Sequence, residues 1–276
     1  MSWSYTELHS SIDRACRVVE LARSQWYYRS KKNDEALINK LQTLAEEYPT
    51  RGFDDYYGRI RNEGLRWNRK RVLRVYRSLK LSLRRKRKRR LPARVGQVLA
   101  QSLTPNNSYS MDFVSDSLVT GRKVRVLNIL DDCTREVLAC YADYSIPGYK
   151  VVMVLEDIIR ERGCPQQIRV DNGPEFLSFV FADWCKMKGI HIHYIQPGKP
   201  MQNGYVERLN RTFREDVLDA YLFDQLEQLR ILCEGWAYDY NHLKPHSAHK
   251  GMVPAVARIL GGGTPAQNAG THVIYK

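Results

Sequence analysis

Long apolar segments are missing from this sequence. No run reaches the roughly 18 consecutive apolar residues that a membrane-spanning helix needs. The first 30 residues are charged and lack the apolar stretch of a secretory signal peptide. We therefore predict neither a membrane span nor secretion, and we expect a cytoplasmic protein. Hydrophobic residues still make up 43% of the chain, which argues against wholesale disorder.

A metal-binding pattern of cysteines is also missing. The six cysteines include no Cys-x-x-Cys pair, and no pair of histidines stands at ligand spacing to a pair of cysteines. A structural zinc site is therefore poorly supported. In a cytosolic protein, scattered cysteines are most simply reduced thiols in or near the core.

Acidic residues are scarce in the first third of the chain. Residues 1–100 hold 25 Lys+Arg and 10 Asp+Glu, whereas residues 101–276 hold 19 and 20. The net charge of +14 therefore arises entirely within the first third. This segregation indicates a polyanion-binding region joined to a nearly neutral domain, with nucleic acid as the favoured partner. A merely solubilising surface is the alternative.

The first third is expected to be helical. Residues 11–29 fit two short helices, with Ser24 capping the second, and this makes a helix-turn-helix candidate; an ordinary helical hairpin fits equally well. Residues 35–48 place leucines on one helical stripe. Asn68 is expected to cap a helix over 69–79 with a cationic outer face. The side chains that we expect to contact DNA there are Arg69, Lys70, Arg71, Arg74 and Arg77.

Seven uninterrupted cations follow that helix. Because like charges repel and cannot pack into a core, we predict an extended linker when this segment is unbound. On DNA it would neutralise phosphates and give strong, salt-sensitive affinity, although a targeting signal is a competing interpretation. The residues of this run are Arg84, Arg85, Lys86, Arg87, Lys88, Arg89 and Arg90.

From residue 108 the pattern becomes that of an α/β fold. Three β-rich runs with short polar turns predict an antiparallel meander. A helix over 149–162, a strand at QIRV, a helix over 175–188, a strand at HIHYIQ and a long helix over 203–218 follow. The order βββ-α-β-α-β-α indicates a mixed sheet flanked by helices.

Three acids stand out within this α/β region. Asp112 interrupts an apolar strand, and Asp171 follows the QIRV strand. A buried carboxylate needs compensation, either from an arginine or from a metal ion shared with a second carboxylate. Neighbouring strands could hold the two aspartates side by side, where their repulsion favours a divalent cation. Glu207 follows after 35 intervening residues, on a helix that Asn203 is expected to cap.

The acids lie within recognisable motifs. The segments are MDFVSDSL, DDCTRE, VDNGPEF, QNGYVERLNRTFRED and YDYNHLKPHSA. With the 35-residue spacing they resemble the D,D(35)E core shared by retroviral integrases and many bacterial transposases. These segments are most similar to those of the second-reading-frame transposases of the third bacterial insertion-sequence family, and the similarity covers about residues 5–255.

The resemblance implies a ribonuclease-H-like fold and an enzyme that cuts DNA and transfers its strands. Asp112, Asp171 and Glu207 would be the catalytic acids and would hold two Mg²⁺ (or Mn²⁺) ions. Arg211 and Arg214 would hold phosphate nearby, and Asn172 would orient Asp171 or the DNA. The implied partners are the element's terminal repeats, target DNA and an upstream-frame product joined by frameshifting or association. An oligomer assembled on DNA, at the bacterial nucleoid, is the corresponding expectation.

The motifs and the charge pattern together predict four parts. These are a helical DNA-binding region over 1–83, a basic linker over 84–107, an integrase-like catalytic core over 108–222 and a C-terminal helical extension and tail over 223–276.

The sequence leaves the roles of some residues, and the function itself, open to alternatives. Lys244-Pro245-His246 stands where the family usually has Arg-Pro-His, and we expect His246 and Asn241 to form structural hydrogen bonds. Asp131 and Asp132 are interpreted as turn residues. A metal-dependent nuclease that cuts without joining, a non-catalytic DNA-binding regulator and an inactive element copy are the competing functions. Strand joining in Mg²⁺ would separate them.

Overall fold

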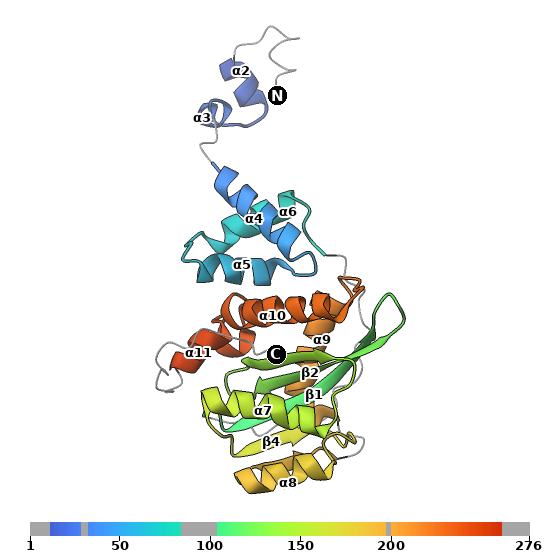
Figure 1. The fold of residues 1–276 in the computed structure, drawn as a ribbon. Coiled ribbons are helices and arrows are strands. Elements are labelled where there is room, and N and C mark those ends of the chain that lie inside the picture. Colours follow the sequence, from blue (N-terminus) through green and yellow to red (C-terminus); the bar gives the residue numbers. More distant parts are fainter. Residues whose placement is uncertain (1–11, 29–32, 84–103, 197–199, 261–276) are drawn as a thin grey trace. The chain divides into compact units, whose positions relative to one another are not determined.

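The computed structural model describes residues 12–28, 33–83, 104–196 and 200–260 (Figure 1). The chain divides into two compact units, Met1–Lys40 and Leu41–Lys276. Within the described residues, no helix is both long enough and apolar enough to span a bilayer. The cationic run 84–90 lies outside the described residues.

The first unit contains the two short helices expected over residues 11–29. They are α2 (Ile12–Val18) and α3 (Arg23–Trp26). Ala15 and Cys16 are buried. The predicted cap at Ser24 is wrong, because Ala22 precedes the first turn of α3 and Ser24 lies inside that helix.

Three further helices precede the sheet. They are α4 (Glu35–Glu47), α5 (Phe53–Asn62) and α6 (Arg69–Ser78). The predicted cap of α6 is confirmed, since the Asn68 side chain accepts a hydrogen bond from the amide of Lys70 at 2.8 Å. Val72, Val75 and Tyr76 turn inward, which leaves Arg69, Lys70, Arg74 and Arg77 exposed and Arg71 half-buried.

The rest of the second unit is built on one five-stranded sheet in the order β3-β2-β1-β4-β5. Its strands are β1 (Ser108–Ser117), β2 (Lys123–Asp131), β3 (Val137–Asp143), β4 (Gln167–Val170) and β5 (His191–Tyr194). The first three pair antiparallel, which confirms the predicted meander, whereas β4 pairs parallel with both β1 and β5.

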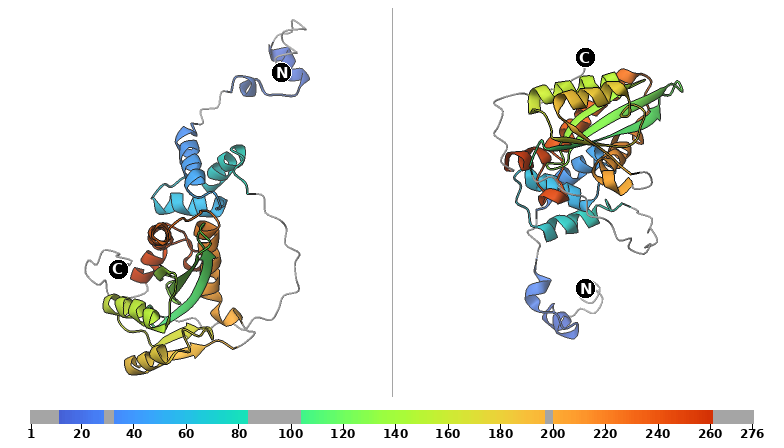
Figure 2. Two further views of the ribbon diagram at one scale, coloured as in Figure 1. Left: turned by 45° about the vertical axis from the view of Figure 1, so that its right-hand side comes forward. Right: turned by 90° about the horizontal axis from the view of Figure 1, so that it is seen from below.

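Helices cover both faces of this sheet (Figures 1 and 2). On one face, α7 (Gly148–Arg162) and α8 (Phe179–Lys188) pack in a core with residues such as Tyr109, Leu127 and Ile168. On the other, α9 (Gly204–Phe213) and α10 (Leu226–His242) bury their apolar stripes against Val114 and Val126. The predicted mixed sheet flanked by helices is therefore confirmed. Two short 3₁₀ turns, η1 (Pro200–Asn203) and η3 (Ser247–His249), and helix α11 (Pro254–Leu260) complete the unit.

The helices around the acids differ from the prediction in two places. The helix expected from residue 175 begins at Phe179, where the Ser178 hydroxyl caps it. The long helix expected over 203–218 is α9 followed by a wider π turn, η2 (Arg214–Leu218). Asn203 does not cap α9; its side-chain amide donates instead to the carbonyl of Met111 at 3.2 Å.

Four of the six cysteines are buried, Cys133 is half-buried and Cys164 is exposed, and all six are free thiols. Their positions agree with the expectation of unlinked cysteines in or near the core, except at Cys164.

Candidate active site

Asp112 lies in the middle of β1, opposite Asn128 of β2. One carboxylate oxygen accepts from the backbone amide of Phe113 at 2.8 Å, and the other accepts from the side-chain amide of Asn210 at 2.9 Å. Among the described residues, no arginine or lysine forms an ion pair with it. A structural arginine therefore does not account for this half-buried carboxylate.

Asp171 follows β4, the parallel neighbour of β1. Because Ser110 stands opposite Arg169 in that pairing, Asp112 and Asp171 follow at the same end of the two strands. The Asp171 carboxylate accepts from the amide of Gly173 at 3.0 Å. A Cβ at Gly173 would lie only 3.0 Å from that carboxylate oxygen, so the absence of a side chain permits the tight turn.

Glu207 lies in the first turn of α9. The helix is fixed to β1 by two asparagines, one on each side of Glu207. Asn203 donates to the carbonyl of Met111, and Asn210 donates to Asp112. The side-chain amide of Asn128 in turn donates a hydrogen bond to the side-chain oxygen of Asn210 at 2.7 Å. The sheet, the helix and the Asp112 carboxylate are therefore joined through consecutive side-chain hydrogen bonds.

Asp112 and Glu207 have perturbed pKa values. Burial, together with the charges of Asp171 and Glu207, raises the pKa of Asp112 to about 6 against the opposing hydrogen bonds from Phe113 and Asn210. Burial also raises the pKa of Glu207, and Arg211 opposes this shift. Even so, no three His, Cys, Asp or Glu side chains in the described part of the chain stand close enough together to hold one metal ion. The acids therefore lie near enough for the charges of Asp171 and Glu207 to act on Asp112, but their side chains are not arranged as a set of metal ligands.

Other predicted site residues occupy the surroundings of the acids. The side-chain amide of Asn172 donates to the carbonyl of Ile195 at 3.0 Å, which ties the Asp171 loop to the segment after β5. Arg214 donates to the carbonyl of Ser115 at 2.8 Å and lies 3.9 Å from the carboxylate of Asp116. Arg211 is exposed on α9.

Glu175 is held by an ion pair with Arg125. Burial favours a higher pKa for Glu175, but the Arg125 guanidinium outweighs it and lowers the pKa below its usual range. Glu175 is therefore a paired, charged acid beside the Asp171 loop.

Three motif residues have structural hydrogen bonds. Asp131 accepts from the amides of Cys133 and Thr134, as expected of a turn aspartate. Asp132 also lies in the turn, as predicted, but its carboxylate is fully buried and accepts from the hydroxyls of Ser108 and Ser110 instead of from the backbone of the turn. The Asn241 side chain accepts a hydrogen bond from the amide of Val137 and donates one to its carbonyl, each at 2.8 Å, which confirms the predicted structural role.

Sequence reasoning missed Asn128 and Asn210. The available signals were a polar residue inside the apolar β2 run and an asparagine three positions after Glu207, which is the same helical face. Neither signal identifies the partner, because the contact joins residues 82 positions apart.

The mixed five-stranded sheet with helices on both faces is the architecture of an integrase core, and comparison with known proteins agrees. Two family descriptions, both "Integrase core domain", match residues 103–200 and 188–254. The intasome structure from simian T-cell lymphotropic virus shares the fold, with a TM-score of 0.52 at 18% identity over 74% of this chain and 70% of that one.

Closer relatives come from bacterial insertion elements. A 31.7 kDa protein of insertion element IS407 from Burkholderia multivorans is 37% identical over 257 residues, which cover 92% of this chain and 93% of that protein. A 39.2 kDa protein of insertion element IS476 from Xanthomonas euvesicatoria is 36% identical over 244 residues, or 88% and 70% of the two chains. This chain belongs to the insertion-element transposases that carry a ribonuclease-H-like integrase core. The predicted family and fold are confirmed.

Proposed function

We propose that Asp112, Asp171 and Glu207 are the catalytic acids of this transposase, acting in metal-dependent cleavage and strand transfer of the element's DNA. The observation that carries the proposal is geometric: Asp112 and Asp171 follow at the same end of the paired strands β1 and β4, and Asn203 and Asn210 fix the helix of Glu207 to β1. The charges of Asp171 and Glu207 also contribute to the raised pKa of Asp112. Stability alone gives no reason to place two further carboxylates where their charges disfavour the ionised form of Asp112. A divalent cation removes that repulsion, and oxygen ligands of this kind suit Mg²⁺ and Mn²⁺.

The residues fit such ions in chemistry. Two bound Mg²⁺ or Mn²⁺ ions would supply Lewis acidity at the attacking oxygen and at the leaving 3′ oxygen. The carboxylates would hold them from strand β1, the loop after β4 and helix α9, and Asn210 would orient the Asp112 carboxylate. Asn172 would keep the Asp171 loop in place through its bond to Ile195.

DNA contacts belong to the same proposal. The exposed cations of α6 and the run 84–90 would bind backbone phosphates, and Arg211 and Arg214 would do so beside the acids. The division into a DNA-binding region over 1–83, a linker over 84–107, a core over 108–222 and an extension over 223–276 assigns these roles along the chain. An oligomer on DNA and an upstream-frame partner follow from the family resemblance.

The decisive experiment is strand joining by the Glu207→Gln variant. Purified protein is incubated with labelled DNA that carries the element's ends, in Mg²⁺. Joined strands should form with the unaltered chain and be lost with Glu207→Gln, while DNA binding is retained. Glu161→Gln, an exposed glutamate of α7, is the matched control and should join normally.

The outcomes separate the competing functions. Cleaved but never joined strands from the unaltered chain would identify a nuclease. Unchanged joining by Glu207→Gln would remove Glu207 from the catalytic set. Adding the upstream-frame product to a chain that does not join alone tests the proposed partner.

A further inference from the structure

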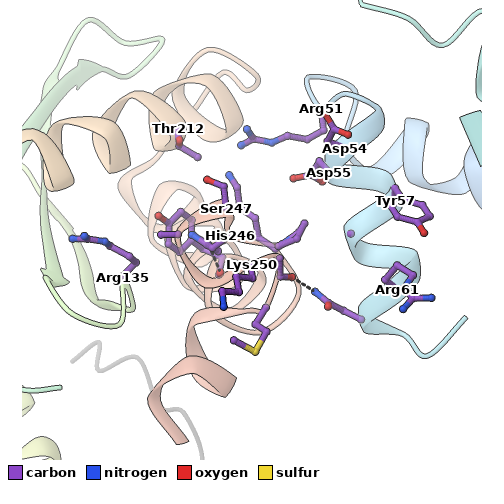
Figure 3. A pocket seen from close by; sticks show the side chains of 18 of the residues that line it. Arg51, Asp54, Asp55, Tyr57, Arg61, Arg135, Thr212, His246, Ser247 and Lys250 are labelled. Atoms are coloured by element: carbon purple, nitrogen blue, oxygen red, sulfur yellow. Dashed lines mark hydrogen bonds between the residues drawn. The ribbon is translucent and has the colours of Figure 1, made fainter. Parts of the chain in front are cut away.

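A cavity lies on a face of α9 other than the one that carries Glu207. It has a volume of about 830 Å³ and is lined by α5, by α9 and by the segment that follows α10 (Figure 3). Tyr205, Arg208 and Thr212 contribute from α9 at helical spacing. The segment after α10 contains the Lys244-Pro245-His246-Ser247 motif, which the catalytic proposal leaves without a role.

The cavity wall is built from interlocking backbone. The backbone amide of His246 donates to the carbonyl of Met252 at 3.1 Å. The backbone amide of Gly251 donates to the carbonyl of His246 at 2.9 Å. Pro245 packs directly on α5, where a Cβ at Gly58 would lie 2.5 Å from the proline ring. The motif therefore forms a closed loop seated on a helix.

Positive charge dominates this cavity. Two aspartates line it, but Asp54 already binds Arg69 and Asp55 already binds Arg59, each at 2.8 Å. Of the lining cations, Arg51 is paired with Asp216. The remaining cations of the lining are Arg61, Arg135, Arg208, Lys244 and Lys250.

Two of these cations carry buried nitrogens without a hydrogen bond. The Lys244 ammonium is one, and its nearest acid oxygen, on Asp216, lies 3.7 Å away and is shared with Arg51. Nη1 of Arg135 is the other, and its guanidinium lies over the Tyr205 ring, 3.1 Å from the centroid. A buried cationic nitrogen that makes no hydrogen bond costs free energy that a bound anion would recover. Burial and repulsion from Arg51 accordingly lower the pKa of Lys244 to about 8.

The exposed cations complete the set. Within the described part of the chain, Arg61, Arg208 and Lys250 form no ion pair, and all three side chains are exposed. Several guanidinium and ammonium groups around one cavity suit a phosphate, because arginine forks match its oxygens and lysine adds a point charge. The volume exceeds that of a single phosphate and leaves room for attached sugar.

We propose that this cavity binds a backbone phosphate of the DNA on which the transposase acts. Lys244 and Arg135 form its buried part, and Arg61, Arg208 and Lys250 surround them. Because Arg208 follows Glu207 directly in α9, DNA held here is positioned by the same helix that carries the catalytic glutamate. The choice of DNA as the source of the phosphate rests on the proposed function.

The test measures DNA affinity of the full chain without metal, so catalysis plays no part. A labelled duplex is titrated at several KCl concentrations with Arg208→Gln and Lys250→Gln, and with Arg160→Gln as the control. Arg160 is an exposed arginine of α7 that pairs only weakly with Asp157 three residues away. Each lost phosphate contact should reduce the slope of log affinity against log salt by about 0.9 and weaken binding several-fold. The control should match the unaltered chain.

A second arm identifies the source of the phosphate. Thermal melting is followed in inorganic phosphate and in chloride of equal ionic strength, with Lys244→Gln as the variant. Salt slopes unchanged in both surface variants would overturn the proposal. Stabilisation by inorganic phosphate that Lys244→Gln abolishes, combined with unchanged slopes, would identify a free-phosphate site and also overturn it. Because this readout is binding, the joining result of Glu207→Gln stands or fails separately.

Discussion

Replacing Arg59 by methionine should destabilise the second unit, because Arg59 joins helix α5 to helix α10 through a buried ion pair. Its side chain is only 4% exposed. Two guanidinium nitrogens donate to the two carboxylate oxygens of Asp239, each at 2.8 Å, and the third donates to Asp55 at 2.8 Å. The hydroxyl of Tyr48 also donates to Asp239 at 2.8 Å, and its ring lies under the guanidinium.

The expected loss follows from the charge that the substitution leaves behind. Removing one partner of a buried ion pair typically costs about 3–5 kcal/mol. Asp239 keeps the hydroxyl of Tyr48 and the nearby charge of Lys244, so the lower end, about 3 kcal/mol, is expected. Asp239→Leu should cost a similar amount, and the double variant should cost less than the sum by roughly 2 kcal/mol.

Urea unfolding followed by circular dichroism gives these free energies. Arg160→Met is the control, because the Arg160 side chain is 72% exposed and its pair with Asp157 should contribute no more than about 1 kcal/mol. Equal losses for Arg59→Met and Arg160→Met, or strict additivity in the double variant, would refute the reasoning.

The same ion pair predicts a pH dependence. Burial favours a higher pKa for Asp239, but Arg59 outweighs it and lowers the pKa below that of an unfolded aspartate. The stabilisation is therefore complete above the ordinary Asp range and is lost as pH falls through the depressed folded pKa. The gap between the unaltered chain and Arg59→Met should narrow in acid.

Three further predictions concern the acids and two glycines. Millimolar MgCl₂ should raise the melting temperature more at about pH 7.5 than at about pH 5, because the Asp112 carboxyl, with a pKa of about 6, must lose its proton to bind a cation; equal shifts would contradict this. Asn210→Ala should raise the Mg²⁺ concentration needed for strand joining by about 10–100-fold while DNA binding is unchanged, and an unaltered requirement would count against its role. Gly148→Ala should lose about 1–3 kcal/mol in urea unfolding, because its Cβ would lie 2.0 Å from the Ser178 hydroxyl. Gly235→Ala, in open space on α10, should gain up to about 1 kcal/mol, and the opposite ranking would refute the packing argument.

Local signals predicted the framework of this fold well. The antiparallel meander was visible in apolar runs separated by short turns, and the Asn68 cap was visible one residue before its helix. Asp112 could be singled out because a carboxylate within an apolar strand demands compensation. Its place beside Asp171 needed the parallel pairing of β1 with β4, which joins strands about 60 residues apart and leaves no local mark.

Predictions failed where a polar side chain forms its hydrogen bond with a group far away in the sequence instead of with the nearby backbone. Asn203 has the right position and residue type for a helix cap, yet the carbonyl of Met111 takes its amide. Asp132 lies in the turn as predicted, yet its carboxylate binds buried serines of β1 instead of the backbone of the turn. Side-chain bonds of this kind compete with local ones, and only the tertiary structure decides between them.

Helix α9 faces three different environments, and this makes it intolerant of changes in length. Glu207, Arg208 and Leu209 are consecutive, yet they belong to the acids, the cationic cavity and the apolar core. Each residue of an α-helix turns the chain by about 100°. Deleting a single codon before Glu207 would therefore move a charge into the core and a leucine to the surface, whereas most substitutions would alter one environment alone. Natural copies of the element should show replacements along this helix but no gaps, and a survey of their sequences can check this.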